Sequence, residues 1–480
     1  MTALSDAKSE AADVSSDLSN HSRDDLERRL VRKIDLHMSA IVLLYAMSNI
    51  DRANISTARL AGFEQDLHLQ GSQYATILSI VNVGTIVMQV PANMFLHWLE
   101  RPAILIPCSM MMWGVISVLT GAAQNYTEVL LARLLLGFAE APFFPGIIFL
   151  ISGWYKRDEL AMRATLVICG SVFSSGLGTL FASGVLAGMR GVLGQASWRR
   201  ETWLFYIEGS VTVIVAICAM FILPSFPHNT RWLTPEERSL AISRLADDGY
   251  GRMDGPGKQT TMQGLRHALS DWKVWWFTVA LIVDHIALSY AMYFPTLVAT
   301  MGYDTTVTLL LTTPPSVLGI IGAFVFSRLS DHTHKRFIYI FASNAFAALG
   351  FTVSMCTMST VARYASMFLM AISGAGQMVL WAWIKTTFAR EPAKRAVAIA
   401  MISGVSAVGS IGGSYIWPLN WGPTYRYSYA ICFAALGVTT AMLGVMHLHL
   451  KRVNEQIEIN ERNAQDINDL QDPVGFRYLV

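Results

Sequence analysis

Charged residues are scarce in this chain of 480 residues: they make up 15% of the sequence, whereas 53% of the residues are hydrophobic. About a quarter of the residues of a soluble domain are charged, so this balance excludes an ordinary soluble protein. Positive and negative charges nearly cancel, and the net charge of +2 offers no strongly basic surface for nucleic acid. We therefore expect a lipid bilayer, and no nucleic acid, around this protein.

Motifs for metal, cofactor or nucleotide binding are also missing. The five cysteines fall in apolar runs without a CxxC pair, which is typical of buried small side chains and not of disulfides or metal ligands. No glycine-rich phosphate loop is present, which argues against ATP as the energy source. The pairs His332/His334 and His447/His449 lack the repeated HxxxH pattern of metal-dependent membrane enzymes. We expect no cofactor and no metal, and an enzyme is only a remote alternative.

Long apolar runs dominate what is present. Each of these runs is long enough to cross a hydrocarbon core of about 30 Å as a helix, and none shows the alternating pattern of a membrane β-barrel. The sequence predicts an all-α integral membrane protein with twelve transmembrane helices. The predicted spans are 37–58, 72–96, 102–121, 127–150, 163–188, 203–223, 274–300, 305–327, 337–358, 363–388, 395–417 and 425–448.

The spacing of the spans divides the chain into two bundles of six helices each. An N-terminal tail, 1–36, precedes the first bundle, 37–223. A long polar linker, 224–273, leads to the second bundle, 274–450, and a C-terminal tail, 451–480, follows. Both tails and the linker are expected to lie outside the membrane.

The distribution of positive charge predicts the orientation. Lys and Arg concentrate in both tails, in the linker and in the loops on that same side, whereas the opposite loops hold few. By the positive-inside rule, we expect both termini to lie in the cytoplasm. We also expect a monomeric multi-pass protein of the cell membrane. The triplet Asn125-Tyr126-Thr127 is then a glycosylation sequon on an outer loop, with Asn125 as the acceptor.

Eight ionisable residues interrupt the apolar runs. A charge at membrane depth costs roughly 2.5–3.5 kcal/mol even on a lenient scale, so we expect these side chains to face protein or water and to have a function. They are Asp51, Arg52, Arg133, Glu140, Glu208, Asp284, His285 and Lys385.

The two halves show a weak internal repeat, which makes the predicted bundles pseudo-symmetric. Asp51-Arg52 in the first span is matched by Asp284-His285 in the seventh, at nearly the offset that relates the glycine-rich fifth and eleventh spans. In the eleventh span, Gly404, Gly409 and Gly412 are small residues at a spacing that lets helix backbones approach closely.

Several short motifs occur in order along the first half of the chain. They are found at 50–55, 91–93, 133–141, 145–146, 154–157 and 232–238. Together they resemble the major facilitator superfamily and, more narrowly, its fungal anion:cation symporter branch, the relatives of allantoate and nicotinate permeases. In the second half, 327–331 resembles the loop signature between helices eight and nine of that superfamily, whereas its counterpart at 96–102 departs from the pattern.

The resemblance implies a fold and a mechanism. Helices one, four, seven and ten are expected to line a central cavity between the bundles, with substrate near the midplane and alternating access by rocking. Of the eight ionisable residues within the apolar runs, only Glu208 lies outside these four helices. Lys385 lies near the end of helix ten. We expect Glu208, on the peripheral helix six, to pair with Arg199 or Arg200.

The arginines are the main candidates for binding a substrate. The guanidinium of Arg133 is always charged and matches a carboxylate bidentately, although it could instead form a structural ion pair with Asp51 or Glu140. Arg52 is either a structural latch or a second binding group. Further candidates that could supply hydrogen bonds, ring contacts or charge are Gln377, Trp381, Tyr290 and Lys385.

Proton coupling needs a buried group that takes up and releases a proton. Asp284 and His285 lie near the predicted midplane of span seven, where a buried carboxyl group or an imidazole can do so at physiological pH. The alternative for them is a satisfied pair within one helix. Glu140 and Asp51 are the other two candidates.

These observations favour a secondary active transporter that moves a small organic anion, a carboxylate or a vitamin-like compound, together with protons. The nearest alternative is an efflux pump of the same fold that exports a toxin or a secondary metabolite. The sequence does not name the substrate, because specificity depends on side chains that converge from separate helices.

Overall fold

The computed structural model describes most of the chain. The described residues are 2–99, 101–156, 159, 163, 167, 170, 174, 178–186, 188, 200–224, 226–227, 230, 233–247, 261–388, 392–463 and 477–479. The fifth predicted span, 163–188, is therefore described only in part, and Arg199 and the side chain of Arg200 lie outside the described residues.

The first bundle consists of long helices that coincide with the predicted spans. α1 runs unbroken from the N-terminal tail through the first span, and the short α2 (Phe63–Asp66) leads from it towards α3. The helices are α1 (Thr2–Ala61), α3 (Gln73–Leu99), α4 (Pro102–Ala122), α5 (Tyr126–Glu140), α6 (Phe143–Ser152) and α8 (Arg200–Ile222).

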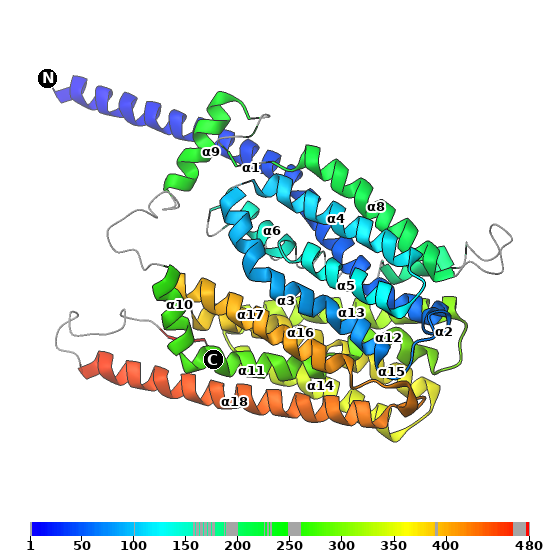
Figure 1. Ribbon diagram of the computed structural model, residues 1–480. Coiled ribbons are helices and arrows are strands. Elements are labelled where there is room, and N and C mark those ends of the chain that lie inside the picture. Colours follow the sequence, from blue (N-terminus) through cyan, green and yellow to red (C-terminus); the bar gives the residue numbers. More distant parts are fainter. Residues whose placement is uncertain are drawn as a thin grey trace.

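The second bundle repeats this pattern beneath the first in the view of Figure 1. A single turn of 3-10 helix, η2 (Leu419–Trp421), precedes its last helix. The helices are α11 (Trp272–Ala287), α12 (Tyr290–Ala299), α13 (Thr305–Thr333), α14 (Arg336–Cys356), α15 (Thr360–Ala371), α16 (Ser373–Thr387), α17 (Pro392–Ser414) and α18 (Arg426–Asn463).

The helices have the length and composition that the sequence predicted for membrane spans. In the described part of the chain, nine helices are long and apolar enough to cross a membrane. α1 and α3 are also helical over the first two predicted spans, so every predicted span except 163–188 is a helix among the described residues. The all-helical membrane fold is as predicted.

Three of the spans are interrupted near their middle. The fourth breaks at Ala141-Pro142 between α5 and α6, the seventh at Leu288-Ser289 between α11 and α12, and the tenth at Ile372 between α15 and α16. An interruption leaves backbone groups without helical partners, and within a membrane this is tolerated where protein or water satisfies them. These are three of the four spans expected to line a central cavity.

The buried apolar residues show how the two bundles meet. We call the end of the molecule that carries α9 (Pro235–Asp247) the linker end, and the opposite end, which carries α2, the α2 end. At the α2 end, one apolar cluster contains residues of both bundles, including Phe63, Tyr74, Tyr293 and Trp417. Towards the linker end each bundle has a separate cluster. The apolar core thus joins the bundles at the α2 end.

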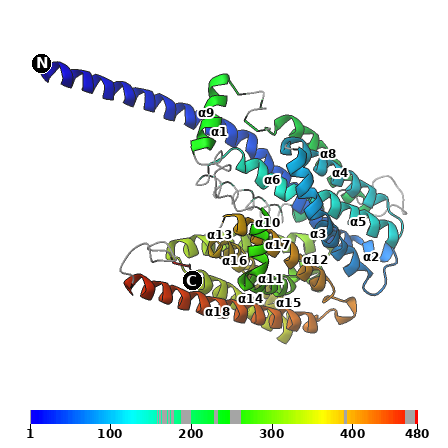
Figure 2. The same cartoon turned by 60° about the vertical axis from the view of Figure 1, so that its left-hand side comes forward.

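Polar contacts between the bundles follow the same distribution; the labels α2 and α9 mark the two ends of the molecule in Figures 1 and 2. Thr179 and Thr313 share a hydrogen bond of 3.1 Å, and Ser183 donates to the carbonyl of Thr306. The hydroxyl of Tyr415 lies 3.0 Å from the Thr76 Oγ1. All of these residues lie nearer the α2 end than the linker end.

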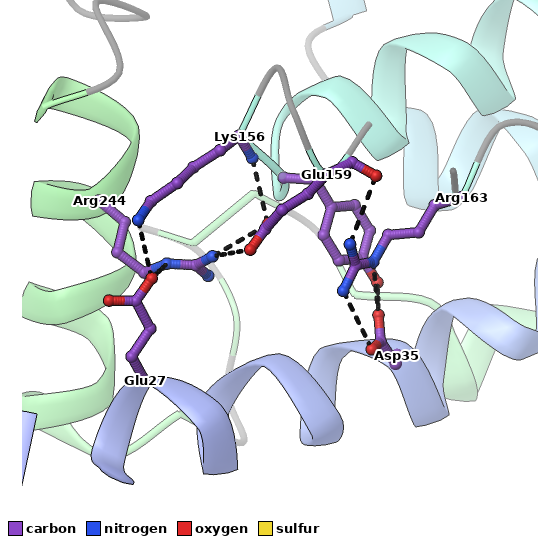
Figure 3. Close-up of polar contacts among 7 residues, drawn as sticks. Glu27, Asp35, Lys156, Glu159, Arg163 and Arg244 are labelled. Atoms are coloured by element: carbon purple, nitrogen blue, oxygen red, sulfur yellow. Dashed lines mark hydrogen bonds and ion pairs between the residues drawn. The ribbon is translucent and has the colours of Figure 1, made fainter. Parts of the chain in front are cut away.

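The linker helix α9 is attached to the first bundle by ion pairs. Arg244 on α9 contacts Glu27 on α1 and Glu159 after α6, each at 2.8 Å, and Lys156 contacts Glu27 at 2.8 Å (Figure 3). A further ion pair joins Lys33 to Glu237 at the start of α9. The linker is therefore partly ordered and packs on the first bundle.

The described end of the chain, 477–479, folds back onto the second bundle. The side chain of Asn454 makes two hydrogen bonds of 2.8 Å with the backbone of Tyr478. The indole of Trp383, on α16, donates to the carbonyl of Leu479. The C-terminal tail is thus linked to a helix of the bundle interior, and α18 itself continues to Asn463.

Candidate functional site

Asp51 lies at the centre of a buried polar group in the first bundle. Its side chain is 1% exposed. The carboxylate oxygen Oδ2 accepts hydrogen bonds from the indole of Trp113, at 3.0 Å, and from the hydroxyl of Thr212, at 2.9 Å. Oδ1 has no partner among the described residues. Neutral donors, and no cation in direct contact, therefore hold this carboxyl group in place.

Arg52 points in a different direction and pairs with Glu140. Its Nη2 lies 2.6 Å from Glu140 Oε2 and its Nε donates to the same oxygen at 2.7 Å. The side chain of Glu140 is 2% exposed, whereas that of Arg52 is 46% exposed. The predicted latch role of Arg52 thus has a specific partner on α5, and its guanidinium also has an open side.

Arg133 is buried without an ion pair. The residue is 3% exposed, and its Nε has no hydrogen-bond partner in the described part of the chain. The guanidinium carbon lies 5.7 Å from the ring centre of Phe205, and electrostatic attraction reaches it from Glu140 and Asp51. The sequence left open a structural ion pair of Arg133 with Asp51 or Glu140. In the described structure these two acids attract Arg133 from a distance and do not contact it.

Glu208, on α8, faces the same group. It is 1% exposed, and neither of its carboxylate oxygens has a hydrogen-bond partner among the described residues. The polar groups that interact with it are the Asp51 carboxyl and the amide of Asn54. The pairing we expected with Arg199 or Arg200 falls on side chains outside the described residues.

The second bundle holds Asp284 and His285 in a more isolated setting. Asp284 is 5% exposed and its Oδ2 has no partner among the described residues. His285 is half-buried, and its Nδ1 is likewise unpartnered there. Neighbouring residues of a helix point about 100° apart. No contact between the two side chains is found in the described structure, so the alternative of a satisfied pair within one helix is not seen there.

The candidates on α16 differ in their surroundings. Gln377 is half-buried, and Trp381 is half-buried against the apolar cluster of the second bundle. Lys385 is exposed, and in the described part of the chain no carboxylate lies within ion-pair distance of it. Lys385 therefore keeps its charge accessible at the linker end of the helix.

Tyr290 is engaged in packing. It is 4% exposed, and its hydroxyl donates to the carbonyl of Met370 at 2.5 Å and lies 2.8 Å from the hydroxyl of Ser373. These contacts tie α12 to the junction of α15 and α16. The hydroxyl that we considered for substrate binding is therefore used inside the second bundle.

Asn125 caps α5 at the α2 end. Its exposed side chain accepts a hydrogen bond from the Glu128 backbone at 3.0 Å and donates to the Glu128 carboxylate at 2.8 Å. The bond from the Glu128 backbone makes Asn125 an N-cap residue, which stabilises the first turn of a helix. Glycosylation at Asn125 remains a prediction from the sequence.

Arg59 is a site residue that the sequence analysis did not single out. It is 7% exposed and pairs with Glu64 at 3.1 Å. Its guanidinium carbon lies 4.2 Å from the ring centre of Tyr74 in the first bundle and 5.4 Å from that of Tyr293 in the second, and Nη1 donates to Thr296. Arg59 thus joins the bundles at the α2 end.

The sequence also did not predict the hydrogen-bond partners of Asp51. Trp113 and Thr212 come from two separate helices, and only a three-dimensional structure brings them together. One signal was available: Thr212 follows Glu208 by four residues, so the two polar side chains share one face of an otherwise apolar helix.

Comparison with known proteins identifies the family. The sequence profile described as the Major Facilitator Superfamily matches residues 41–414. The chain belongs to this superfamily. The MFS-type transporter cnsO of Penicillium expansum is 28% identical over 464 residues, which cover 92% of this chain and 86% of that protein. A putative tartrate transporter of Agrobacterium vitis is 29% identical over 402 residues, which cover 81% of this chain and 84% of that protein.

Solved structures of the superfamily share the fold. A bacterial homologue of the human lysosomal transporter Spinster, in an inward-facing and unoccupied conformation, superposes with a TM-score of 0.64 at 15% identity and covers 86% of this chain and 95% of its own. A D-xylose-proton symporter gives a TM-score of 0.62 at 14% identity, with coverage of 84% and 97%. The protein is a membrane transporter of the Major Facilitator Superfamily and not an enzyme.

Proposed function

We propose that this superfamily member takes up a small organic anion together with protons, and that it is a relative of the fungal anion:cation symporters. The linker end then faces the cytoplasm, in agreement with the excess of Lys and Arg in the tails and the linker. Because the bundles are joined at the α2 end, the described conformation is closed towards the outside. Substrate enters when this outer contact opens.

The observation that carries this proposal is the unpaired guanidinium of Arg133. A buried charge without a partner is costly, so a protein that keeps one gains something from it. Arg133 is 3% exposed and lacks an ion pair among the described residues, although the acids Glu140 and Asp51 attract it electrostatically. Its planar fork can bind a carboxylate through two parallel hydrogen bonds. We assign Arg133 as the anion-binding residue.

Arg52 has a supporting role in this proposal. It is held by Glu140 and leaves part of its guanidinium exposed. An approaching anion meets this accessible charge first, and Arg133 is more deeply buried, about two helical turns before the break between α5 and α6. The similarity to a putative tartrate transporter supports a carboxylate as the substrate class.

The proton is carried, in our proposal, by a buried carboxyl group. Asp51 in the first bundle and Asp284 in the second are both buried and lack a cation in direct contact. Glu140 is less suitable because Arg52 compensates its charge directly. Taking up a proton next to a bound anion keeps the loaded site neutral, which lowers the cost of moving it across the membrane.

Uptake into proteoliposomes tests the anion site. The purified full-length protein is reconstituted, and uptake of radiolabelled tartrate, as the probe, is followed with and without an inward proton gradient. Arg133→Ala should reduce uptake to background, because the carboxylate loses its bidentate partner, and Arg133→Lys should restore only part of it. Tartrate efflux with no uptake under the same gradient would instead favour an exporter.

A matched control separates loss of the site from loss of folding. Arg462 is exposed and pairs with Glu458 on the same helix, far from the bundles' interior. Arg462→Ala should transport normally, and all variants should show one symmetric peak in size-exclusion chromatography. If Arg133→Ala folds and still takes up tartrate with unchanged affinity, Arg133 is not the anion site.

A further inference from the structure

Glu208 and Asp51 lie opposite each other across the contact between α8 and α1. Thr212, one turn after Glu208, donates a hydrogen bond of 2.9 Å to Asp51 Oδ2. Asn54, nearly one turn after Asp51, interacts with Glu208. Since residues three and four apart share one helix face, the two carboxyl groups face the same small volume between the helices.

Nothing in the described structure compensates the charge of Glu208. Both of its oxygens are buried and lack hydrogen-bond partners, and the Nδ2 of Asn54 has no partner of normal geometry either. The ionisable group that acts on it is a second acid, Asp51. A structural acid at this depth is normally paired, so Glu208 requires another explanation.

The charges around this volume supply that explanation. The ionisable side chains of the described helices that interact across it are Asp51 of α1, Arg133 and Glu140 of α5, and Glu208 of α8. Arg52 of α1 points in a different direction but contacts Glu140. Tyr74 of α3 is a neutral phenol beside Arg133. Arg52 compensates Glu140, which leaves one guanidinium, that of Arg133, for two carboxyl groups. The group is neutral only if one proton is bound.

We propose that Asp51 and Glu208 form a two-carboxyl proton site in which either residue can hold the proton. In the resting protein one of the two is protonated and the other is a carboxylate offset by Arg133. When an anion binds to Arg133, it compensates the positive charge that had offset the carboxylate. The remaining carboxylate then accepts one proton from water, forming an O–H bond, and the loaded site returns to neutrality.

This inference rests on the proposed function but makes a separate claim: the proton belongs to the pair and not to Asp51 alone. If so, removing one carboxyl group removes the resting proton, because the other acid is then offset by Arg133. Proton-coupled uptake persists, because the remaining acid still responds to the anion. Only the loss of both carboxyl groups abolishes coupling.

Infrared spectroscopy tests the resting proton without any substrate. The absorption of protonated carboxyl groups is measured on the full-length protein in lipid at neutral pH, for wild type, Asp51→Asn, Glu208→Gln and the double variant. We expect the absorption of one protonated group to be lost equally in both single variants, with no further loss in the double variant. If Asp51→Asn keeps this absorption, Glu208 holds the proton by itself and the pair is refuted.

Uptake of labelled tartrate, as the probe, tests the coupling. Both single variants should retain stimulation by a proton gradient, and the double variant should lose it while still exchanging tartrate across the membrane. If either single substitution alone abolishes the stimulation, the two residues are not equivalent and the inference fails. Glu458→Gln, at an exposed acid on α18, is the control and should match the wild type.

The two proposals fail in different ways. If the wild-type protein takes up tartrate without any response to a proton gradient, the proposed symport is wrong, whereas the infrared result still decides whether the pair shares a proton. Thr212→Val keeps both carboxyl groups and removes only a hydroxyl donor to Asp51. It should therefore keep the resting absorption, which distinguishes a proton site from a merely structural polar contact.

Discussion

At the scale of single residues, the charges of the first bundle fall into two kinds. Arg52 and Glu140 compensate each other directly at 2.6 Å, whereas Arg133, Asp51 and Glu208 have no ion pair among the described residues. A compensated pair fixes the geometry of two helices, here α1 and α5. The uncompensated groups remain free to respond to an anion or a proton.

Removing Arg52 should destabilise the protein more than removing the charge of Glu140, because only Glu140 is buried. Arg52→Ala leaves a buried carboxylate without its donor and should lower the free energy of unfolding by about 1–3 kcal/mol. Glu140→Gln leaves the half-exposed Arg52 hydrated and should cost less. Thermal unfolding in detergent, followed by tryptophan fluorescence, measures both.

A double-mutant cycle decides whether the contact itself is responsible. The variant that carries both Arg52→Ala and Glu140→Gln should be more stable than Arg52→Ala alone, because no buried charge is left behind. Strictly additive losses would show that the two residues do not interact in the folded protein.

At the scale of elements, the linker helix α9 is held by acids that contact basic side chains. Burial alone would raise the pKa of Glu27, but its contacts with Lys156 and Arg244 outweigh this and lower it below its ordinary value of 4.5. The pKa of Glu237 is also lowered: burial opposes the shift, and hydrogen bonds from Thr234 and Lys33 cause it. Acids with a lowered pKa stabilise the attached state above pH 4.5 and lose this contribution as the pH falls through the lowered value.

Hydrogen exchange should therefore detect the release of α9. Protection of residues 235–247 should be constant between about pH 6 and 8 and should fall steeply below the ordinary carboxyl value of 4.5. Arg244→Ala removes the contacts with Glu27 and Glu159 and should reduce this protection at neutral pH. Arg462→Ala, at an exposed pair, is the control. Equal protection in Arg244→Ala and wild type would show that packing alone holds α9.

The elements are also the level at which the sequence was most informative. Apolar runs determine where helices cross a membrane, and helices are found at the predicted spans throughout the described residues. The small residues of the eleventh span allow the predicted close approach: a Cβ atom at Gly409 would lie only 2.1 Å from the carbonyl oxygen of Ile282 on α11. A Cβ at Gly412 would meet its neighbours at an ordinary 3.9 Å.

The site was less predictable, for a physical reason. An ionisable residue within an apolar run is visible in a sequence. Its partner is not, because partners come from helices separated by many residues. Trp113 and Thr212 beside Asp51, and Tyr293 beside Arg59, are uncharged residues in apolar spans that resemble packing residues until the fold brings them together. Glu208 was expected to pair with Arg199 or Arg200, whose side chains lie outside the described residues, and the ionisable group that it faces among the described residues is an acid.

At the scale of the whole molecule, the contacts between the bundles are unequal at its two ends. The apolar cluster that contains residues of both bundles and the hydrogen bonds between them lie towards the α2 end. If the bundles rock about a central site, these contacts must separate once in every transport cycle. A covalent bond across them should therefore stop transport.

The pair Thr179 and Thr313 is suited to this test because their hydroxyl oxygens lie 3.1 Å apart across the two bundles. In a background without the five native cysteines, the double substitution Thr179→Cys and Thr313→Cys should transport when reduced and lose transport when oxidised. A matched pair within the second bundle, Ser354→Cys and Ser366→Cys, replaces hydroxyls 2.6 Å apart and should remain active after oxidation. Because both pairs form similar bonds, only the one between the bundles should block the cycle. Full transport by the cross-linked Thr179 and Thr313 variant would show that the α2 end does not open, and the rocking mechanism would have to be abandoned for this protein.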